Sequence, residues 1–383
     1  MKIISVVGAR PNFIKIAPFI RAIEKHNEQS GQKVEHMLVH TGQHYDHKMS
    51  QKFFEDLNIP PADIHLGIGS GTHAEQVGNT MIAFEKVVEV EKPDWVVVIG
   101  DVNAALACSV TAKKQLVKCC HIEAGLRSGD MAMPEEINRL ATDRISDLLL
   151  TPGKFSIENL KQEGVEDARI VFVGNIMIDT LEMQRETASS LEIGDIVMRN
   201  LLLPGSEVPE LHDDSYAVLT LHRPSNVDYR EILSPLISFL TDEVMTDIPL
   251  IWPIHPRAKK QLKEFGLWEK VVAAPGLVLL NPIGYNDMLR LNMTARLLLT
   301  DSGGLQEECT VLGTPCLTLR NNTERLMTLR RHGGGSVMVG NKVEQIRKEY
   351  HIALKKERSP IRPELWDGNA AKRCLEAILK ASA

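Results

Sequence analysis

Short apolar runs alternate with longer helix-like stretches along the chain, and this rhythm limits the fold more than any other feature. In the first half the apolar runs lie at residues 3–7, 35–40, 94–100, 118–123, 147–152 and 169–174. They are apolar at nearly every position, where a strand with one exposed face would alternate. Strands of this kind indicate a parallel sheet covered by helices on both faces.

The same rhythm restarts after a polar stretch that contains Pro and Gly, residues 201–215. The second set of apolar runs lies at residues 216–222, 249–255, 276–280, 295–300 and 315–319. The sequence therefore predicts an α/β protein with two doubly wound, Rossmann-like domains facing a central cleft. We expect an N-terminal domain over residues 1–173, a C-terminal domain over residues 174–367, and a last helix over residues 368–383 that folds back on a domain.

The composition limits the classes of molecule that the protein is expected to bind. The 383 residues carry a net charge of −6, and the basic residues are dispersed, so neither nucleic acid nor an anionic membrane is an expected partner. No apolar run is long enough to span a bilayer and the N-terminus does not resemble a signal peptide, so we expect a cytoplasmic protein. The six cysteines show no CxxC pair and lie mostly in apolar segments, so we expect buried thiols without a disulfide or a zinc site.

The segment 295–308, ARLLLTDSGGLQEE, is the most informative for function. It reads as a strand that passes through Ser302, Gly303 and Gly304 directly into a helix that carries Glu308. Small residues at such a junction let phosphate groups approach the free N–H groups of the helix, and a carboxylate one turn later can accept from ribose hydroxyls. An ordinary tight turn with a capping side chain is the alternative.

Polar residues also follow the strands of the first half, where ligands of open α/β sheets bind. Arg10 and Lys15 follow the first run and are placed to neutralise a diphosphate, although they would equally suit the flanks of a surface helix. Asp101 and Glu123 each end a strand, as a catalytic group or a helix cap would. Further along lie weaker candidates, namely Gln43 and His44 in a loop, and Glu135 and Arg139 at a helix start, where a glutamate is an ordinary dipole partner.

In the second half His222 follows a strand and is a candidate to protonate or hydrogen-bond a leaving phosphate, a core histidine being the alternative. His255 has a similar but weaker placement. Arg325 lies where another positive charge would meet a diphosphate. The shared position of these residues at strand ends favours one nucleotide-linked ligand.

Two other classes of enzyme are disfavoured because their motifs are missing from the sequence. No strand–GxGxxG–helix opens either domain, and no tyrosine has a lysine four residues later, which disfavours a nicotinamide-dependent epimerase or dehydrogenase. A P-loop is absent as well, which disfavours ATP hydrolysis.

With these residues in hand, the chain resembles the non-hydrolysing UDP-N-acetylglucosamine 2-epimerase family over nearly its whole length. The motifs that carry the resemblance are GARPNFIK (8–15), TGQH (41–44), GDVN (100–103), HIEAGLRSGD (121–130), PEEINR (134–139), VGNIMID (173–179), LHRPSN (221–226), DSGGLQEE (301–308), LGTPCL (312–317) and RNNTER (320–325). The family's fold is similar to that of two-Rossmann (GT-B) glycosyltransferases, with UDP held mainly by the second domain.

The resemblance implies anti elimination of UDP to give 2-acetamidoglucal, followed by re-addition of UDP with the opposite configuration at C2. It implies a homodimer, no metal and no cofactor. By the same match the catalytic residues are Asp101, Glu123, Glu135 and His222. The residues that bind the UDP-sugar are Arg10, Lys15, Arg139, Ser302, Gly303, Gly304, Glu308 and Arg325, with His222 also on the diphosphate. Gln43, His44 and His255 match positions that contact an allosteric UDP-N-acetylglucosamine in some members.

The chain departs from the family pattern at Ser225, where Glu is common, and at Leu326, where Pro is common. These positions flank the expected sugar and phosphate sites, so three alternatives stay open. In the first alternative the enzyme acts on a related UDP-2-acetamido sugar, such as a 2,3-diacetamido uronic acid. In the second it releases free sugar by hydrolysis. In the third the protein is a GT-B glycosyltransferase.

Overall fold

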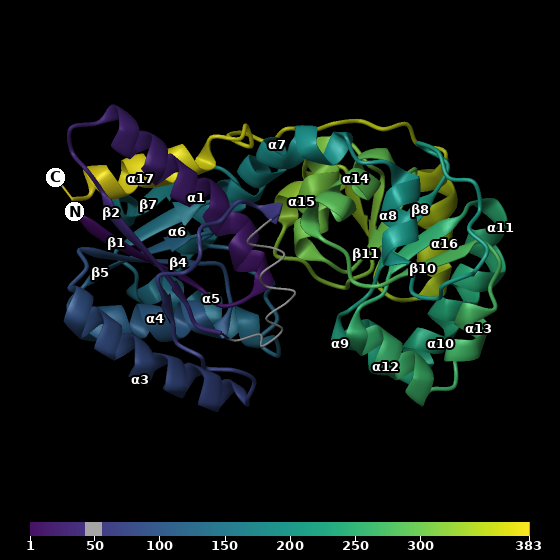
Figure 1. Cartoon of the computed structure of the whole chain (residues 1–383), viewed down its shortest axis with the longest axis horizontal. Helices are drawn as coiled ribbons and strands as arrows, with labels where there is room; N and C mark the ends of the chain where they lie inside the picture. The colour runs from purple at the N-terminus through teal and green to yellow at the C-terminus, as the bar shows by residue number, and fades with distance from the viewer. Residues whose placement is uncertain (43–55, 383) are drawn as a thin grey trace. The chain divides into compact units, whose positions relative to one another are not determined.

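We describe the chain from a computed structural model, which defines residues 1–42 and 56–382. The chain divides into two compact units, unit 1 (residues 1–183 and 363–383) and unit 2 (residues 184–362) (Figure 1). The change of unit falls inside helix α7 (Ile176–Ser189), about ten residues after the sequence-based boundary. The last twenty-one residues return to unit 1. Gln43 and His44 lie outside the described residues.

The described part of unit 1 is built on one parallel sheet with the order β3-β2-β1-β4-β5-β6-β7. Its strands are β1 (Lys2–Val7), β2 (Glu35–His40), β3 (Ile64–His65), β4 (Trp95–Ile99), β5 (Lys118–Ile122), β6 (Leu148–Thr151) and β7 (Ile170–Phe172). All residues of β4, and all residues of β1 except Lys2 and Ser5, are buried and apolar, because helices cover both faces of these central strands. The chain changes its direction of winding beside β1, between β1 and β4, which is where such sheets bind ligands.

The helices of unit 1 lie on both sides of this sheet (Figure 1). Helix α1 (Arg10–Gln29) packs against the C-terminal helix α17 (Ala370–Lys380) on one face, while α3 (His73–Glu91), α4 (Asn103–Lys114) and α5 (Pro134–Ile145) pack in a row on the other. Helix α6 (Lys154–Gln162) packs against β6 and β7, and a short turn of 3-10 helix (Asp167–Arg169) precedes β7. The amphipathic segment at the C-terminus is therefore a helix that completes the sandwich of unit 1.

Unit 2 repeats the architecture with a parallel sheet of order β10-β9-β8-β11-β12-β13. The strands are β8 (Ala217–Thr220), β9 (Leu250–Pro253), β10 (Leu277–Leu280), β11 (Leu297–Thr300), β12 (Cys316–Thr318) and β13 (Ser336–Met338). The apolar core lies in two layers, one on each face. Leu297 and Leu299 point into one layer and Leu298 into the other, which is the alternation expected of a strand.

Each face of the unit 2 sheet has its own helices. The layer that contains Leu299 is covered by α10 (Arg230–Phe239), α12 (Pro256–Glu264), α13 (Trp268–Val272) and α16 (Val343–Leu354). The layer that contains Leu298 is covered by α8 (Ile193–Asn200), α14 (Tyr285–Thr294) and α15 (Gly303–Leu312). The remaining elements are short, namely α9 (Pro224–Val227), a π-helical turn (Leu240–Val244), α11 (Met245–Asp247) and two 3-10 turns (Leu326–Thr328 and Arg330–His332).

The predicted α/β class, the parallel sheets and the strands over the predicted apolar runs are confirmed. Strands β3 and β13 were not predicted, because these edge strands have only two and three residues and are too short to produce a pattern. All six cysteines are buried free thiols, as the apolar surroundings predicted.

Candidate functional site

Asp101 lies directly beyond β4 and is held by an arginine from α5. Arg139 donates from Nε (3.1 Å) and Nη2 (2.6 Å) to Oδ2 of Asp101, and from Nη1 (2.5 Å) to Glu136. The Arg139 side chain is 3% exposed and that of Asp101 is 26% exposed. Asp101 is therefore a charged carboxylate fixed at its base and open to solvent at its edge, the state expected of a group that meets a substrate.

Glu136, rather than the predicted Glu135, forms the buried end of this ion pair. Its carboxylate accepts from the backbone N–H groups of Ser128 and Gly129 as well as from Arg139. Burial alone would raise the Glu136 pKa, but these donors hold it below the ordinary value. Glu135 is half-buried on the first turn of the same helix.

Glu123 follows β5 and forms a buried ion pair with Lys15 of α1. Both side chains are at most 6% exposed. Glu123 has φ +73°, a left-handed conformation that non-glycine residues rarely adopt and that often marks functional sites. The neighbouring Gly100 has φ +69°, and a Cβ there would lie 3.1 Å from both Glu123 Oε2 and Lys15 Nζ.

Asn12 connects the turn between β1 and α1, just before Arg10, to the end of β4, close to the Lys15–Glu123 pair. Its Oδ1 accepts from the N–H groups of Gly8 (3.0 Å) and Ala9 (3.1 Å), and its Nδ2 donates to the carbonyl of Ile99 (2.9 Å), the last residue of β4. Arg10 is the first residue of α1. The ends of β1, β4 and β5 therefore carry Lys15, Asp101 and Glu123 together, with Arg139 on the helix that follows β5, as the sequence predicted.

In unit 2 the junction between β11 and α15 forms the expected turn. Ser302 is the N-cap residue but its side chain makes no capping hydrogen bond, while its N–H donates to Oγ1 of Thr300 (2.9 Å). Helix α15 begins at Gly303. An ideal Cβ at Gly303 would lie 3.0 Å from Glu324 and 3.6 Å from Nε of Arg325, so the side chains of the β12 loop lie against this turn. A helix start without a side-chain cap keeps its N–H groups for an anion.

Asp301 organises the neighbouring loop after β8 and was not singled out as a site residue from the sequence. It is fully buried and accepts from the N–H groups of His222 (3.0 Å) and Arg223 (2.9 Å) and from Nδ2 of Asn226 (3.1 Å). It also contacts Nδ1 of His222 at 2.7 Å. Burial favours the neutral acid, but His222 and these donors keep the Asp301 pKa below its ordinary value.

This arrangement fixes the orientation of His222. With Nδ1 directed to Asp301, the other face of the imidazole stays accessible, and the side chain is 36% exposed. The ring of His255, the N-cap residue of α12, lies 5.7 Å away between centroids. A carboxylate that orients a histidine in this way prepares Nε2 to donate to or accept from a ligand.

Two buried ion pairs come from the loop after β12. Arg325 pairs through Nε with Glu307 of α15 (3.1 Å), and Arg320 donates to Glu324 (2.8 Å). All four side chains are at most 8% exposed. The loop therefore places cationic side chains beside the start of α15. Arg320 was not among the predicted site residues, because its acidic partner Glu324 stands only four residues later in the sequence.

Glu308 is the most perturbed carboxyl of this site. Complete burial raises its pKa to about 7, and the nearby charge of Glu307 adds to the rise, while Tyr285 and Asn292 act against it. The raised pKa brings the ionisation of this carboxyl close to neutral pH, and the ionised form is the one that accepts from a hydroxyl of a ligand.

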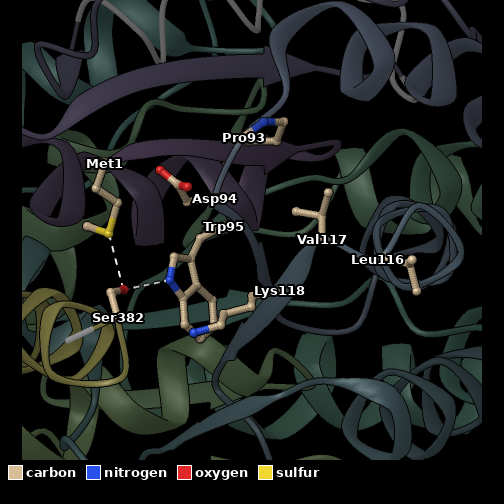
Figure 2. Close-up of a pocket in the computed structure, with 8 residues that line it drawn as sticks. All are labelled: Met1, Pro93, Asp94, Trp95, Leu116, Val117, Lys118 and Ser382. Atoms are coloured by element: carbon tan, nitrogen blue, oxygen red, sulfur yellow. Dashed lines mark hydrogen bonds between the residues drawn. The ribbon is translucent and has the colours of Figure 1, made fainter.

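The sequence-predicted residues thus form two groups, one in each unit. Ser302, Gly303, Gly304, Glu308 and Arg325 come together with His222 at the strand ends of unit 2. A separate pocket of unit 1 lies at the opposite ends of its strands, lined by Met1, Trp95, Lys118 and Ser382 among others (Figure 2). Trp95 donates from Nε1 to Oγ of Ser382 there, so the chain just after α17 lines this pocket, and none of the predicted site residues do.

Over residues 1–42 and 56–382, no cluster of three or more His, Cys, Asp or Glu side chains has the arrangement needed to hold a metal ion. In the same described ranges no helix is both long and apolar enough to cross a bilayer.

Comparison with known proteins places these features in a family. The chain is 40% identical to the UDP-N-acetylglucosamine 2-epimerase of Methanocaldococcus jannaschii over 99% of both chains. It is 36% identical to the UDP-2,3-diacetamido-2,3-dideoxy-D-glucuronate 2-epimerase of Pseudomonas aeruginosa, over 99% of this chain and all of that one. The crystal structure of the M. jannaschii enzyme in complex with UDP-GlcNAc and UDP superposes with a TM-score of 0.88, at 40% identity, over 99% of this chain and 100% of that chain.

The sequence profile of UDP-N-acetylglucosamine 2-epimerase matches residues 26–379. Two parallel α/β sheets with the GT-B-like architecture of these enzymes, and a match over nearly the whole chain, leave one assignment: the protein is a member of the UDP-N-acetylglucosamine 2-epimerase family.

Proposed function

We propose that the enzyme interconverts UDP-N-acetylglucosamine and UDP-N-acetylmannosamine without releasing free sugar. The observation that carries the proposal is the pair of carboxylates at the ends of the adjacent strands β4 and β5, Asp101 and Glu123, each held by a buried cation. Two acid–base groups anchored side by side suit removal of a proton from one face of a carbon and its return to the other.

The chemistry follows from the weak acidity of C2. The C2 proton of the hexose is not adjacent to a carbonyl, so it leaves only as the anomeric bond breaks. In the proposed elimination a carboxylate takes the C2 proton, a double bond forms between C1 and C2, and the electron pair of the C1–O bond leaves with UDP. Re-addition protonates C2 of the 2-acetamidoglucal on the other face and re-forms the bond to UDP. We assign Asp101 and Glu123 to these transfers without ordering them.

Stabilisation of the departing UDP is assigned to unit 2. The uncapped start of α15, Arg325, and His222 oriented by Asp301 supply N–H groups and positive charge, and Glu308 supplies a carboxylate for the ribose. A well-placed donor to a developing anion contributes about 3 kcal/mol to catalysis. The M. jannaschii relative, which has been crystallised with UDP-GlcNAc and UDP, supports a UDP-sugar as the ligand.

Product analysis tests the proposal. Purified enzyme is incubated with UDP-N-acetylglucosamine, and the products are followed by proton NMR. We expect UDP-N-acetylmannosamine and no free sugar at equilibrium. Free N-acetylmannosamine would establish the hydrolysing variant, and transfer of the sugar to an acceptor without any change at C2 would establish a glycosyltransferase.

A second substrate merits a parallel reaction. The similarity to the P. aeruginosa enzyme that acts on UDP-2,3-diacetamido-2,3-dideoxy-D-glucuronate covers the whole chain. That sugar is the second candidate, and Ser225 and Leu326 are the positions where this chain departs from the common family pattern. The same concentration of enzyme is incubated with each UDP-sugar, and kcat/KM is measured for both. A higher value for the diacetamido uronic acid would replace UDP-N-acetylglucosamine as the assigned substrate.

A further inference from the structure

A buried histidine and aspartate lie behind the two carboxylates of unit 1, and nothing in the proposed mechanism uses them. His121 is on β5 and Asp143 is on α5, and each side chain is 1% exposed. Nδ1 of His121 lies 2.6 Å from Oδ1 of Asp143, and Nε2 lies 2.8 Å from the carbonyl oxygen of Gly100. The pair therefore spans from α5 to the residue that precedes Asp101.

Asp143 is an anion in this arrangement. Its Oδ2 accepts from the N–H of Gly125 (2.9 Å) and from Nη1 of Arg127 (2.7 Å). Burial on its own would raise the pKa of Asp143, but His121 and Arg127 together bring it below the ordinary value.

The hydrogen bonds of His121 fix the orientation of its ring. A backbone carbonyl only accepts, so Nε2 of His121 donates to Gly100, while Nδ1 faces the carboxylate of Asp143. His121 therefore links Asp143 to the backbone of Gly100.

The two ends of this link lie next to the proposed acid–base residues. Gly100 immediately precedes Asp101, and Gly125 lies two residues after Glu123. Glu123 has a positive φ (+73°), which non-glycine residues rarely adopt, and Gly100 and Gly125 also have positive φ (+69° and +81°), which glycine adopts without strain. Asp143 supports one turn directly and the other through His121.

We propose that His121 and Asp143 form a positioning pair that sets the backbone of Gly100 and Gly125, and thereby the placement of Asp101 and Glu123 on the sugar. The role rests on the proposed function, since it matters for turnover only if these carboxylates transfer the C2 proton. The pair touches no substrate atom in this assignment and acts through the backbone.

A spectroscopic measurement tests the link without reference to activity. In ¹⁵N-histidine-labelled full-length enzyme, long-range proton–nitrogen correlation shows which ring nitrogens of each histidine carry a proton. We expect one pattern with a proton on Nε2 that disappears in His121→Gln. A His121 pattern without a proton on Nε2 would overturn the proposal, whatever the enzyme is found to catalyse.

Two isosteric variants test the consequence for catalysis. The Gln amide of His121→Gln can keep the donor at the position of Nε2, toward Gly100, and the Asn amide of His121→Asn can keep only the donor toward Asp143. We expect kcat for UDP-N-acetylglucosamine to fall about 10²-fold in His121→Asn and less than about 10-fold in His121→Gln, because small misplacements of reacting groups cost rates of this order. KM and UDP affinity should change little in either variant.

Glu163→Gln is the matched control, because Glu163 pairs with the outer edge of Arg127 and its side chain is 35% exposed. It should retain the Nε2–H signal of His121 and wild-type kcat. Equal losses of kcat in His121→Gln and His121→Asn, or a KM effect as large as the kcat effect, would overturn the positioning role. If either variant fails to fold, the wild-type signal decides alone. Wild-type enzyme without turnover would contradict the proposed function and leave the spectroscopic result standing.

Discussion

The two units share one architecture but present their polar groups in different ways. At the strand ends of unit 1, side-chain carboxylates are held by cationic side chains, Asp101 by Arg139 and Glu123 by Lys15. At the strand ends of unit 2, a buried carboxylate, Asp301, holds backbone N–H groups and a histidine, and the start of α15 has no side-chain cap. In the proposed function unit 1 supplies the acid–base groups and unit 2 supplies donors for an anion.

In the proposed function the two units divide the work of one reaction. Groups that exchange protons need fixed side chains, and Glu123 is held at φ +73°, a conformation that non-glycine residues rarely adopt. Groups that stabilise a leaving diphosphate need only fixed dipoles and charges, which backbone amides supply. Substitutions in unit 1 should therefore lower kcat, and those in unit 2 should weaken UDP binding.

The largest effect is expected for the carboxylates. Asp101→Asn and Glu123→Gln should each lower kcat by about 10³-fold, because each removes a proton-transfer group while leaving the side-chain volume unchanged. UDP affinity, measured by calorimetry, should stay within about threefold of wild type. Near-normal turnover in both variants would show that the acid–base assignment is wrong.

A glycine beside the Lys15–Glu123 pair should be nearly as sensitive. Gly100→Ala places a Cβ 3.1 Å from both charged atoms at φ +69°, so we expect a loss of about 10²-fold in kcat. Gly164→Ala is the control, since it has φ +77° with no atom within 4 Å of the new Cβ. Both variants should lose about 1 kcal/mol of unfolding free energy through the backbone conformation. Similar kcat values in the two would contradict the role of the pair.

In unit 2 the sensitive residue is Asp301. Asp301→Asn removes the charge that accepts from His222 and Arg223, so UDP affinity should fall about 10- to 30-fold, the worth of one charge-assisted hydrogen bond. Asp228→Asn breaks the exposed ion pair with Arg257 in the same unit and should leave the affinity unchanged. Calorimetric titration with UDP gives both values. If the two variants bind UDP equally, the loop after β8 does not contribute to the anion site.

The smallest expected effect is a dependence of the unfolding free energy on pH, which arises from Glu308. Its pKa rises from 4.5 to about 7 on folding, so the folded state binds more protons than the unfolded chain between these values. The unfolding free energy should therefore decrease as pH rises from 4.5 to 7, by about 1–3 kcal/mol, and stay at the lower level above pH 7. Glu308→Gln should remove this decrease.

Urea unfolding of wild type and Glu308→Gln at several pH values measures the difference. UDP affinity of wild type should also rise as pH increases through 7, because the ionised carboxylate is the better acceptor for a ribose hydroxyl. If the unfolding free energies of wild type and Glu308→Gln change in parallel with pH, the result would contradict a raised pKa of Glu308.

The sheets and the strand-end residues were predictable because continuous apolar runs and the polar residues after them are local patterns. Asp101, Glu123, Ser302 and Glu308 are recognised from their neighbours along the chain alone. The supporting residues were not, because Asp143 and Glu136 are acidic residues on a helix and resemble ordinary surface positions. Their burial depends on partners more than seven residues away, such as Gly125 for Asp143 and Ser128 for Glu136.

Asp301 illustrates the same limit within a recognised motif. The sequence marks it as part of a turn before α15, but its partners His222, Arg223 and Asn226 come from the loop after another strand, β8. Only the parallel pairing of β8 with β11 brings them together. A signal was present in the sequence, because an acidic residue directly follows β11 and Leu-His-Arg directly follows β8.

Exchange at C2 tests the central claim, that the carboxylates of unit 1 transfer the C2 proton while UDP leaves and returns. Wild-type enzyme is incubated with UDP-N-acetylglucosamine in deuterated water, and proton NMR follows the C2 position. We expect deuterium at C2 in the epimerised product at the rate of epimerisation, and a parallel loss of both in Asp101→Asn and Glu123→Gln. Epimerisation that retains the original C2 proton would contradict the elimination mechanism and the assignment of these two residues.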